Sequence, residues 1–330
     1  MRNLLLTVFL VAAWSAKADG PDVAAIVERH VLPGYQALAQ ETADLEMRAS
    51  EDCSPKSPAL IDAYHDAFDA WINVSHLRFG PSEQDDRAFA LAFWPDPRGS
   101  TPKVLAELIR NDDPSVSNPE DFAAVSVAGR GFYALEFLLY EPQFTDPDVS
   151  EYSCALLRAV AIDIARNAAA ILQDWEGGYA QLMSGPGNDI YRTSTEAAQQ
   201  FFTALSTGLE FTSDTRLARP LGTFDRPRPN RAEARRSERS LRHVMLSLSS
   251  TKALAGLISM ENADVEAAFD SAIARATELD DPSFANVDNP QGRLRVEALQ
   301  QNINVIRNIL AQQIGPSLGI AAGFNALDGD

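Results

Sequence analysis

The sequence predicts an all-α protein built from antiparallel helical bundles. Nearly every long segment repeats its apolar residues at three- and four-residue steps, as an amphipathic helix does. We see no convincing run in which apolar and polar residues alternate as they do in a half-buried strand. Prolines and glycines separate the periodic segments, and long helices joined by short connections are typical of bundles.

The apolar stripes give the expected helices in chain order. Leu60, Tyr64, Phe68 and Trp71 form one clear stripe, because they recur at three- and four-residue steps. Equivalent stripes run through residues 156–175, 201–209, 241–248 and 296–310. Proline- and glycine-containing stretches predict loops or helix ends at residues 55–58, 80–81, 95–99, 112–119 and 142–147.

The strongest linker signal divides the mature chain in two. It is the stretch Ser184–Asn188, which contains two glycines and a proline. We therefore expect an N-terminal helical bundle over residues 19–184 and a C-terminal bundle over residues 190–330. Residues 215–230 hold several prolines and predict a long irregular arm, either a functional loop or a plain connector.

The first 18 residues predict a cleavable signal peptide. Arg2 supplies the positive start, Leu4–Trp14 is a short apolar core, and Ala16–Ala18 offers a small-x-small cleavage site. A buried first helix is the alternative. No later segment is apolar enough to predict a transmembrane helix. We expect a mature protein that works outside the cytoplasm.

The charge of the chain excludes some partners. Acidic residues number 46 against 28 basic ones, which gives a formal net charge of −18. Such a chain is repelled by nucleic-acid phosphates, so we expect no nucleic-acid partner. The run Arg226–Arg242 is the best basic patch, but Glu233 and Glu238 interrupt it, which favours a solvated helix face.

Two cysteines, Cys53 and Cys154, are present. In an oxidising compartment an even pair predicts a disulfide, here between the end of the first helix and the start of a later one. Two buried free thiols are the alternative.

Tyr133 and Glu136 are the residues that best suggest chemistry. They stand three apart among apolar neighbours, so both side chains lie on one helix face that is expected to be buried. A buried carboxylate needs a partner, a proton or a cation, and a phenol with a carboxylate offers the oxygen donors that ferric iron prefers. The alternative is a buried hydrogen-bond network. Arg78 and Glu83 flank the turn at Gly80 and are expected to converge with this pair.

These stretches also resemble the imelysin family. Gly131, Tyr133 and Glu136 resemble its Gly-x-His-x-x-Glu motif, with Tyr133 in the place of the histidine. The stretch Arg78–Pro81, followed by Phe93–Pro95, resembles the family's turn after its second helix. The ending Gly323–Asp330 resembles the family's C-terminus.

The resemblance implies two helical bundles that face each other across a cleft, with the motif near the cleft. It also implies a periplasmic or outer-membrane-associated protein linked to iron uptake. Tyr133 departs from the motif, because it removes the imidazole that a zinc peptidase would use, and no His-Glu-x-x-His helix replaces it. The four histidines are scattered, and we interpret them as ordinary surface or core residues.

The function that we expect is non-catalytic binding of a metal ion or a metal-bearing ligand in iron acquisition. Tyr133 and Glu136 would form the core of the site, with Arg78 and Glu83 as neighbours. The cofactor would be iron or another divalent or trivalent metal, and the partners would be envelope iron-uptake proteins. The alternatives are a metal-dependent peptidase and an envelope interaction module that presents the arm at residues 215–230.

Overall fold

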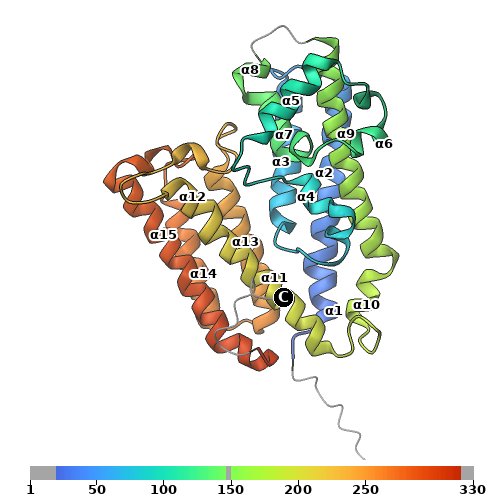
Figure 1. Ribbon diagram of the computed structural model, residues 1–330. Helices are drawn as coiled ribbons and strands as arrows, with labels where there is room; N and C mark the ends of the chain where they lie inside the picture. Colours follow the sequence, from blue (N-terminus) through green and yellow to red (C-terminus); the bar gives the residue numbers. More distant parts are fainter. Residues whose placement is uncertain (1–19, 146–149, 321–330) are drawn as a thin grey trace, which may run out of the picture.

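The structure, a computed structural model, describes residues 20–145 and 150–320, and helices make up most of these ranges (Figure 1). Apart from helices, turns and loops, only an isolated bridge between Thr223 and Arg226 occurs in the described residues. The all-α prediction is confirmed. The predicted signal peptide at residues 1–18 and the C-terminal stretch Gly323–Asp330 lie outside the described residues.

Three long helices form the N-terminal group: α2 (Leu32–Glu51), α3 (Pro58–Val74) and α9 (Glu151–Asp174) (Figure 1). Two short segments, α1 (Val23–Ile26) and the π-helix η1 (Val27–Val31), lead directly into α2. The chain between α3 and α9 holds α4 (Arg87–Leu91), α5 (Ser100–Asn111), α6 (Pro119–Ala123), α7 (Gly131–Tyr140) and α8 (Pro142–Thr145).

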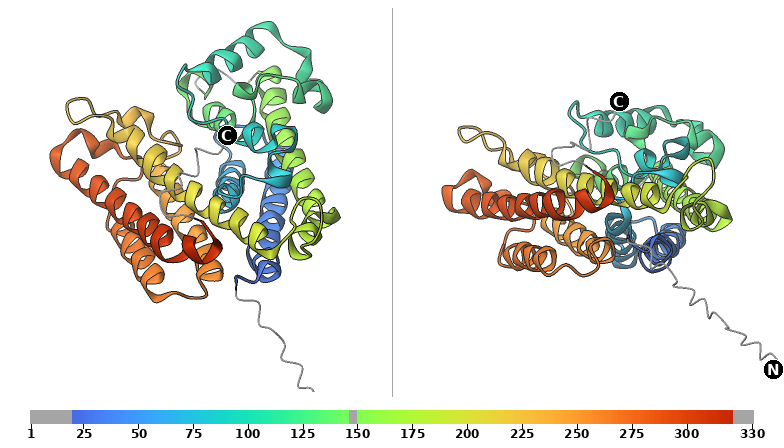
Figure 2. Two further views of the ribbon diagram at one scale, coloured as in Figure 1. Left: turned by 60° about the horizontal axis from the view of Figure 1, so that its bottom comes forward. Right: turned by 90° about the horizontal axis from the view of Figure 1, so that it is seen from below.

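The second group contains α13 (Ser240–Ser259), α14 (Ala263–Thr277) and α15 (Pro290–Ile309). Helix α11 (Ser194–Glu210) crosses diagonally from α10 (Ala180–Ser184) and continues through the π-helix η7 (Phe211–Leu217) into α12 (Ala218–Leu221) (Figures 1 and 2). Further π-helices are η6 (Trp175–Tyr179) and η10 (Leu310–Ile314). Short 3-10 helices are η2 (Gly80–Ser82), η3 (Gln84–Asp86), η4 (Pro114–Ser117), η5 (Val127–Gly129), η8 (Pro229–Arg231), η9 (Ala285–Asp288) and η11 (Gly315–Leu318).

The predicted stripe on α3 forms part of the core. Leu60, Tyr64, Phe68 and Trp71 are all buried, which is what the periodicity predicts. Helix α3 packs against α2 on one side and against α13 of the second group on the other. The predicted linker at residues 184–188 falls between α10 and α11. The division into two bundles there stays a prediction, because the two groups share this packing.

Helix α11 begins where its sequence supplies a cap. The Thr193 hydroxyl accepts the backbone N–H of Glu196 at 3.2 Å, and the Glu196 carboxylate accepts the backbone N–H of Arg192 at 2.7 Å. The first bond satisfies an N–H that the first turn of a helix leaves free, and the second ties the residue before the cap to the helix. Together they fix the start of the helix that crosses between the two groups.

The prediction of an irregular arm over residues 215–230 is partly wrong. The chain stays helical to Leu221, because Leu217 and Leu221 lie one turn apart and are both buried. This packing outweighs the helix-breaking tendency of Pro220. Only the stretch after Gly222 is irregular, with Phe224 at its tip and 81% exposed.

The interpretation of Arg226–Arg242 as a solvated helix face is also wrong. The helix begins only at Ser240, and Glu233 is buried. Arg236 and Arg239 form ion pairs with Glu141 and Asp69 of the N-terminal group. The charges of this segment therefore serve contacts between the two groups.

The expected disulfide is present between Cys53 and Cys154, whose Cα atoms lie 5.4 Å apart. It joins the end of α2 to the first turn of α9. The prediction is confirmed, and the alternative of two free thiols is wrong.

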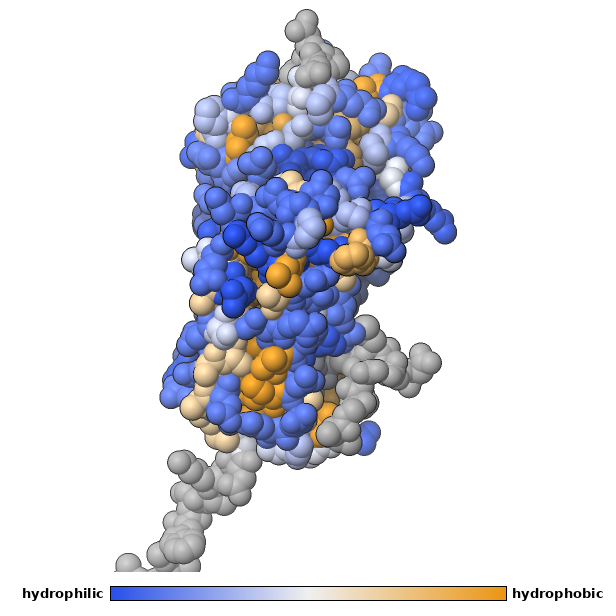
Figure 3. All heavy atoms as spheres, turned by 90° about the vertical axis from the view of Figure 1, so that its left-hand side faces the viewer, coloured by the Kyte–Doolittle hydropathy of each residue, from blue (hydrophilic) through white to orange (hydrophobic). Residues whose placement is uncertain are grey.

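The side of the molecule that α14 and α15 present is mostly hydrophilic, with apolar residues in small separate patches (Figure 3). Among residues 20–145 and 150–320, no helix combines the length and the apolar character that crossing a membrane requires.

Candidate functional site

A pocket of about 550 Å³ lies where the two groups of helices meet. Helix α11 and η7 form one wall, and the end of α3 with the segment around Trp94 forms the other. Aromatic side chains line much of it, and hydroxyl groups and a few charged groups complete the lining. The aromatic residues are Trp71, Trp94, Tyr133 and Phe211.

The motif brings Tyr133 to this pocket. Gly131 has a φ of +74°, and a Cβ at that position would lie 2.3 Å from the carbonyl oxygens of Ala90 and Leu91. Glycine therefore lets α7 begin against the backbone of α4. The Tyr133 hydroxyl donates to Glu233 Oε1 at 2.5 Å. Burial, and next the negative charge of Glu233, raise the pKa of Tyr133 well above its usual value.

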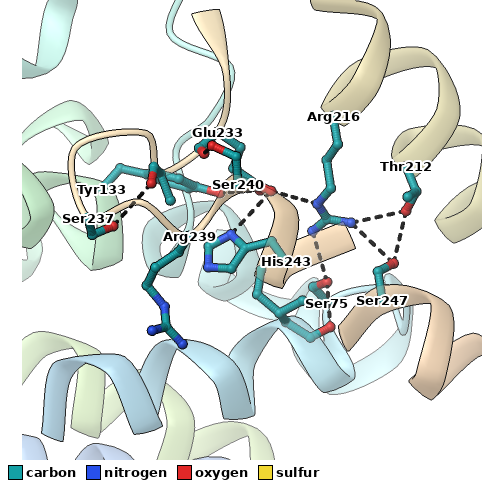
Figure 4. Close-up of polar contacts among 12 residues, drawn as sticks. Ser75, Tyr133, Thr212, Arg216, Glu233, Ser237, Arg239, Ser240, His243 and Ser247 are labelled. Atoms are coloured by element: carbon teal, nitrogen blue, oxygen red, sulfur yellow. Dashed lines mark hydrogen bonds and ion pairs between the residues drawn. The ribbon is translucent and has the colours of Figure 1, made fainter. Parts of the chain in front are cut away.

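Glu233 is the centre of a buried network (Figure 4). Its Oε2 accepts from Arg216 Nε at 2.7 Å and lies 3.2 Å from His243 Nδ1. Burial opposes ionisation here, but the charge of Arg216, together with His243 and the hydrogen bond from Tyr133, lowers the pKa of Glu233 to about 2. Glu233 is therefore a carboxylate at neutral pH.

Each nitrogen of the Arg216 guanidinium group has at least one hydrogen-bond partner (Figure 4). Besides Glu233, its Nη1 lies 3.3 Å from the hydroxyls of both Thr212 and Ser247, and its Nη2 lies 3.5 Å from the Ser75 hydroxyl. Thr212 and Ser247 also bond to each other at 2.9 Å. The network joins η7, α13 and the end of α3 through hydrogen bonds.

Glu136 faces the same segment of the second group. Its Oε1 accepts the backbone N–H groups of Arg236 and Ser237, each at 3.0 Å, and the Ser237 hydroxyl at 2.9 Å. Burial raises the pKa of Glu136, and the bonds from Ser237 oppose that rise. Both motif side chains thus hold the segment 233–237 against α7.

Arg78 and Glu83 pair with each other. Arg78 Nε donates to Glu83 Oε1 at 2.6 Å, and both side chains are more than 40% exposed, at 45% and 42%. Arg78 also lines the pocket with Tyr133. Within the described residues neither Arg78 nor Glu83 hydrogen-bonds to Glu136.

The donors do not fit a bare metal ion at the motif. Among residues 20–145 and 150–320, no three side chains of histidine, cysteine, aspartate or glutamate gather as metal ligands would. The Tyr133 phenol is bonded to a carboxylate, and Glu136 Oε1 already accepts three hydrogen bonds. Ferric iron bound by the Tyr133 oxygen would require the bond to Glu233 to break, and Glu136 could offer only its Oε2 without losing its bonds to the segment 236–237.

The imelysin family model matches residues 31–310. The chain belongs to the imelysin family. Its fold is similar to the crystal structure of an imelysin-like protein from Psychrobacter arcticum, with a TM-score of 0.76 at 18% sequence identity over 92% of this chain and 96% of that one. It is also similar to a protein from Parabacteroides distasonis described as a "putative iron-regulated protein A precursor". There the TM-score is 0.70 at 16% identity, over 90% of this chain and 96% of that one. No curated protein matches the chain.

Sequence reasoning missed much of the site in this imelysin. Glu233 and Arg216 were hidden in segments that we expected to be solvated or irregular. The available signal for Glu233 was that Ala232 and Ala234 flank it in an otherwise arginine-rich run. The histidines are also less ordinary than expected, since His243 contacts Glu233 and His76 lines the pocket.

Proposed function

We propose that this imelysin is an exported, non-catalytic binding protein that takes an aromatic iron chelate into the pocket between its two groups of helices. The observation that carries the proposal is the pocket itself. Its volume of about 550 Å³ lies in the range of roughly 300–1,000 Å³ that is usual for small-molecule sites. Flat aromatic walls favour a ligand that contains rings.

A chelate is favoured over a bare ion by the state of the donors. The Tyr133 hydroxyl and Glu136 Oε1 are bonded within the protein, whereas the pocket is lined by Thr203 and by Arg78, whose Nη1 lies outside its ion pair with Glu83. A hydroxyl and a cation suit the oxygen atoms at the rim of an anionic chelate. The iron context comes from the description of the Parabacteroides distasonis protein as iron-regulated.

Export is supported by the start of the sequence and by the cysteines. Residues 1–18 have the pattern of a signal peptide. The disulfide between Cys53 and Cys154 is typical of a protein from an oxidising compartment. Intact-mass measurement of protein from the bacterial envelope would find Asp19 as the first residue.

The competing function is a metal-dependent peptidase. A metallopeptidase needs several protein ligands around a metal with an open position, and a general base nearby. Glu136 is the acidic group of the motif, and backbone and hydroxyl donors occupy its Oε1. We therefore expect no cleavage of casein by purified protein incubated with zinc, ferrous iron or manganese. Cleavage that a chelator abolishes would establish the peptidase function.

Calorimetric titration tests the binding function. The probe is the ferric complex of 2,3-dihydroxybenzoate, with the free acid and ferric citrate for comparison. We expect the aromatic chelate to bind and the two comparison compounds to bind at least tenfold more weakly. Failure of the wild-type protein to bind the aromatic chelate would contradict the proposal.

A pocket-filling substitution provides the matched control. Thr207 lines the pocket on α11, and Thr277 is exposed at the end of α14. Each hydroxyl donates to the carbonyl oxygen four residues earlier, at 2.9 Å and 2.8 Å. Thr207→Trp should abolish chelate binding, whereas Thr277→Trp should leave it unchanged. Equal affinities of the two variants would place the binding elsewhere.

A further inference from the structure

Two histidines meet beside the pocket, and His76 is the one that lines it. His30 on η1 and His76 just after α3 bring their Nε2 atoms to 2.9 Å, and their rings lie 5.1 Å apart with a tilt of 51°. A neutral imidazole has one N–H and one bare nitrogen. One of the two Nε2 atoms must therefore donate and the other accept, which couples the tautomers of the two rings.

The other ring nitrogen of His76 has no partner within the described residues. His76 is 4% exposed, its Nδ1 atom is buried without a hydrogen bond, and its side chain lines the pocket. A buried polar atom without a partner destabilises the folded protein, because it has lost its bond to water. A ligand in the pocket that forms a hydrogen bond with Nδ1 would remove this destabilisation, which favours binding.

A glycine inside helix α11 makes room for the His76 side chain. Gly208 lies within α11, although glycine is less favourable than alanine inside a helix. A Cβ at Gly208 would lie 2.6 Å from the Cβ of His76. Glycine therefore allows α11 to approach His76 closely. His30 itself belongs to a π-helix, a feature that occurs frequently at functional sites.

Burial keeps the pair neutral. It lowers the pKa of His30 to about 4. Burial, followed by the proximity of His30 and Arg216, lowers the pKa of His76 well below its usual value. A neutral imidazole recognises a hydrogen-bonding atom rather than a charge.

We propose that His76 reads the ligand of this pocket by donating its Nδ1–H to a ligand oxygen, with His30 fixing that tautomer by donating to His76 Nε2. The proposal rests on the proposed function, because it names the group that recognises the chelate. Arg216 has fewer donors left for this role, since Glu233, Thr212 and Ser247 take its Nε and Nη1 hydrogens and Ser75 lies 3.5 Å from its Nη2. His76 Nδ1 is a buried nitrogen without a partner, in a residue that lines the pocket.

The tautomer can be measured without a ligand. Nitrogen-15 NMR of histidine-labelled full-length mature protein distinguishes a protonated Nδ1 from a bare one. We expect His76 to carry its proton on Nδ1. Addition of the diamagnetic gallium(III) complex of 2,3-dihydroxybenzoate should shift the Nδ1 resonance of His76 more than that of His65. A proton on Nε2 of His76 in the free protein would overturn the proposal.

Two isosteric variants separate recognition from packing. In His76→Asn the side-chain amide replaces Nδ1, and in His76→Gln it replaces Nε2 and keeps the bond to His30. We expect His76→Gln to bind the ferric 2,3-dihydroxybenzoate complex about tenfold or more weakly than wild type, as loss of one hydrogen bond predicts. His76→Asn should bind more tightly than His76→Gln. The reverse order would show that His76 acts only through His30 and would overturn the proposal.

A second pair of variants leaves His76 itself in place. Gly208→Ala should push His76 away from α11 and weaken binding of the same ferric complex about tenfold. Gly256→Ala in α13 is the control, because a Cβ there meets no atom within 4 Å. If wild type binds the complex and both His76→Gln and Gly208→Ala bind it equally well, the role of His76 is refuted while the pocket function stands. If wild type does not bind it, both proposals fail.

Discussion

Tyr133 donates its phenolic hydrogen to Glu233, a residue one hundred positions later in the chain, at 2.5 Å. The residue that replaces the motif histidine is thus a link between α7 and the segment before α13. Three residues along α7, Glu136 binds the backbone of the same segment. The motif in this chain joins the two groups of helices at the edge of the pocket.

Tyr133→Phe tests this structural role. The substitution removes one donor from a buried carboxylate, so we expect a loss of roughly 1–3 kcal/mol in the free energy of unfolding, with or without added iron. Urea denaturation measures it. Tyr152→Phe is the control, because Tyr152 is only partly buried and donates to the carbonyl oxygen of Asp113 at 3.1 Å. A ferric absorption band in wild type that disappears in Tyr133→Phe would instead support a metal site.

Glu233→Gln should lower the free energy of unfolding more than Tyr133→Phe does. It leaves the guanidinium of Arg216 buried without its counter-charge, and breaking one side of a buried ion pair costs about 3–5 kcal/mol. Glu238→Gln provides the control in the same segment, because Glu238 is exposed. Thermal unfolding of the two variants would give equal midpoints if the network around Glu233 contributed nothing.

Local sequence pattern was sufficient for the long helices that carry apolar stripes and for their buried faces, but it missed the helical residues 215–221. Leu60, Tyr64, Phe68 and Trp71 repeat with the helical period, and the period alone determines which side of α3 is buried. Cys53 and Cys154 could be paired because only two cysteines exist. These features depend on residues that lie close in sequence or on a single possible partner.

The site depends on partners that spacing does not encode. Glu233 and Tyr133 are one hundred residues apart, and His30 and His76 are forty-six apart. Charge composition predicted a solvated segment around Glu233, because arginine and glutamate are rarely buried. Arg216 reverses that rule here by pairing with Glu233 in the interior. Such exceptions appear only when the tertiary packing is known.

Removal of the disulfide should destabilise the N-terminal group. Cys53 and Cys154 are 101 residues apart, and closing a loop of that size contributes roughly 4–5 kcal/mol in the chain-entropy description. Strain reduces that value in practice, so we expect Cys53→Ser with Cys154→Ser to lose about 2–4 kcal/mol. Urea denaturation of the double variant and of wild type measures the difference. Equal midpoints for the two proteins would contradict a stabilising role.

The last prediction concerns the loss of stability at acidic pH that burial of His30 causes. The pKa of His30 falls from its ordinary value of 6.5 in the unfolded chain to about 4 in the folded protein, because the side chain is buried. Between these values the unfolded chain binds the proton and the folded protein does not, so stability falls as the pH falls from 6.5 towards 4. His76 acts in the same direction. Glu136 acts in the opposite direction, because its pKa is raised.

A comparison of wild type with His30→Gln isolates the histidine contribution. Glutamine keeps a hydrogen-bonding group near His76 but takes up no proton, so the variant should lose less stability than wild type between pH 6.5 and 4.5. The stability that Glu233 contributes is lost mainly as the pH falls from its ordinary pKa of 4.5 to its folded pKa of about 2, so measurements that stop at pH 4.5 avoid most of its effect. Urea denaturation at pH 8, 7, 6, 5 and 4.5 measures both proteins, with pH 8 as the internal reference because His30 is neutral there in both states. Parallel stability curves for the two proteins down to pH 4.5 would show that His30 takes up its proton as readily folded as unfolded, which would contradict its burial beside His76.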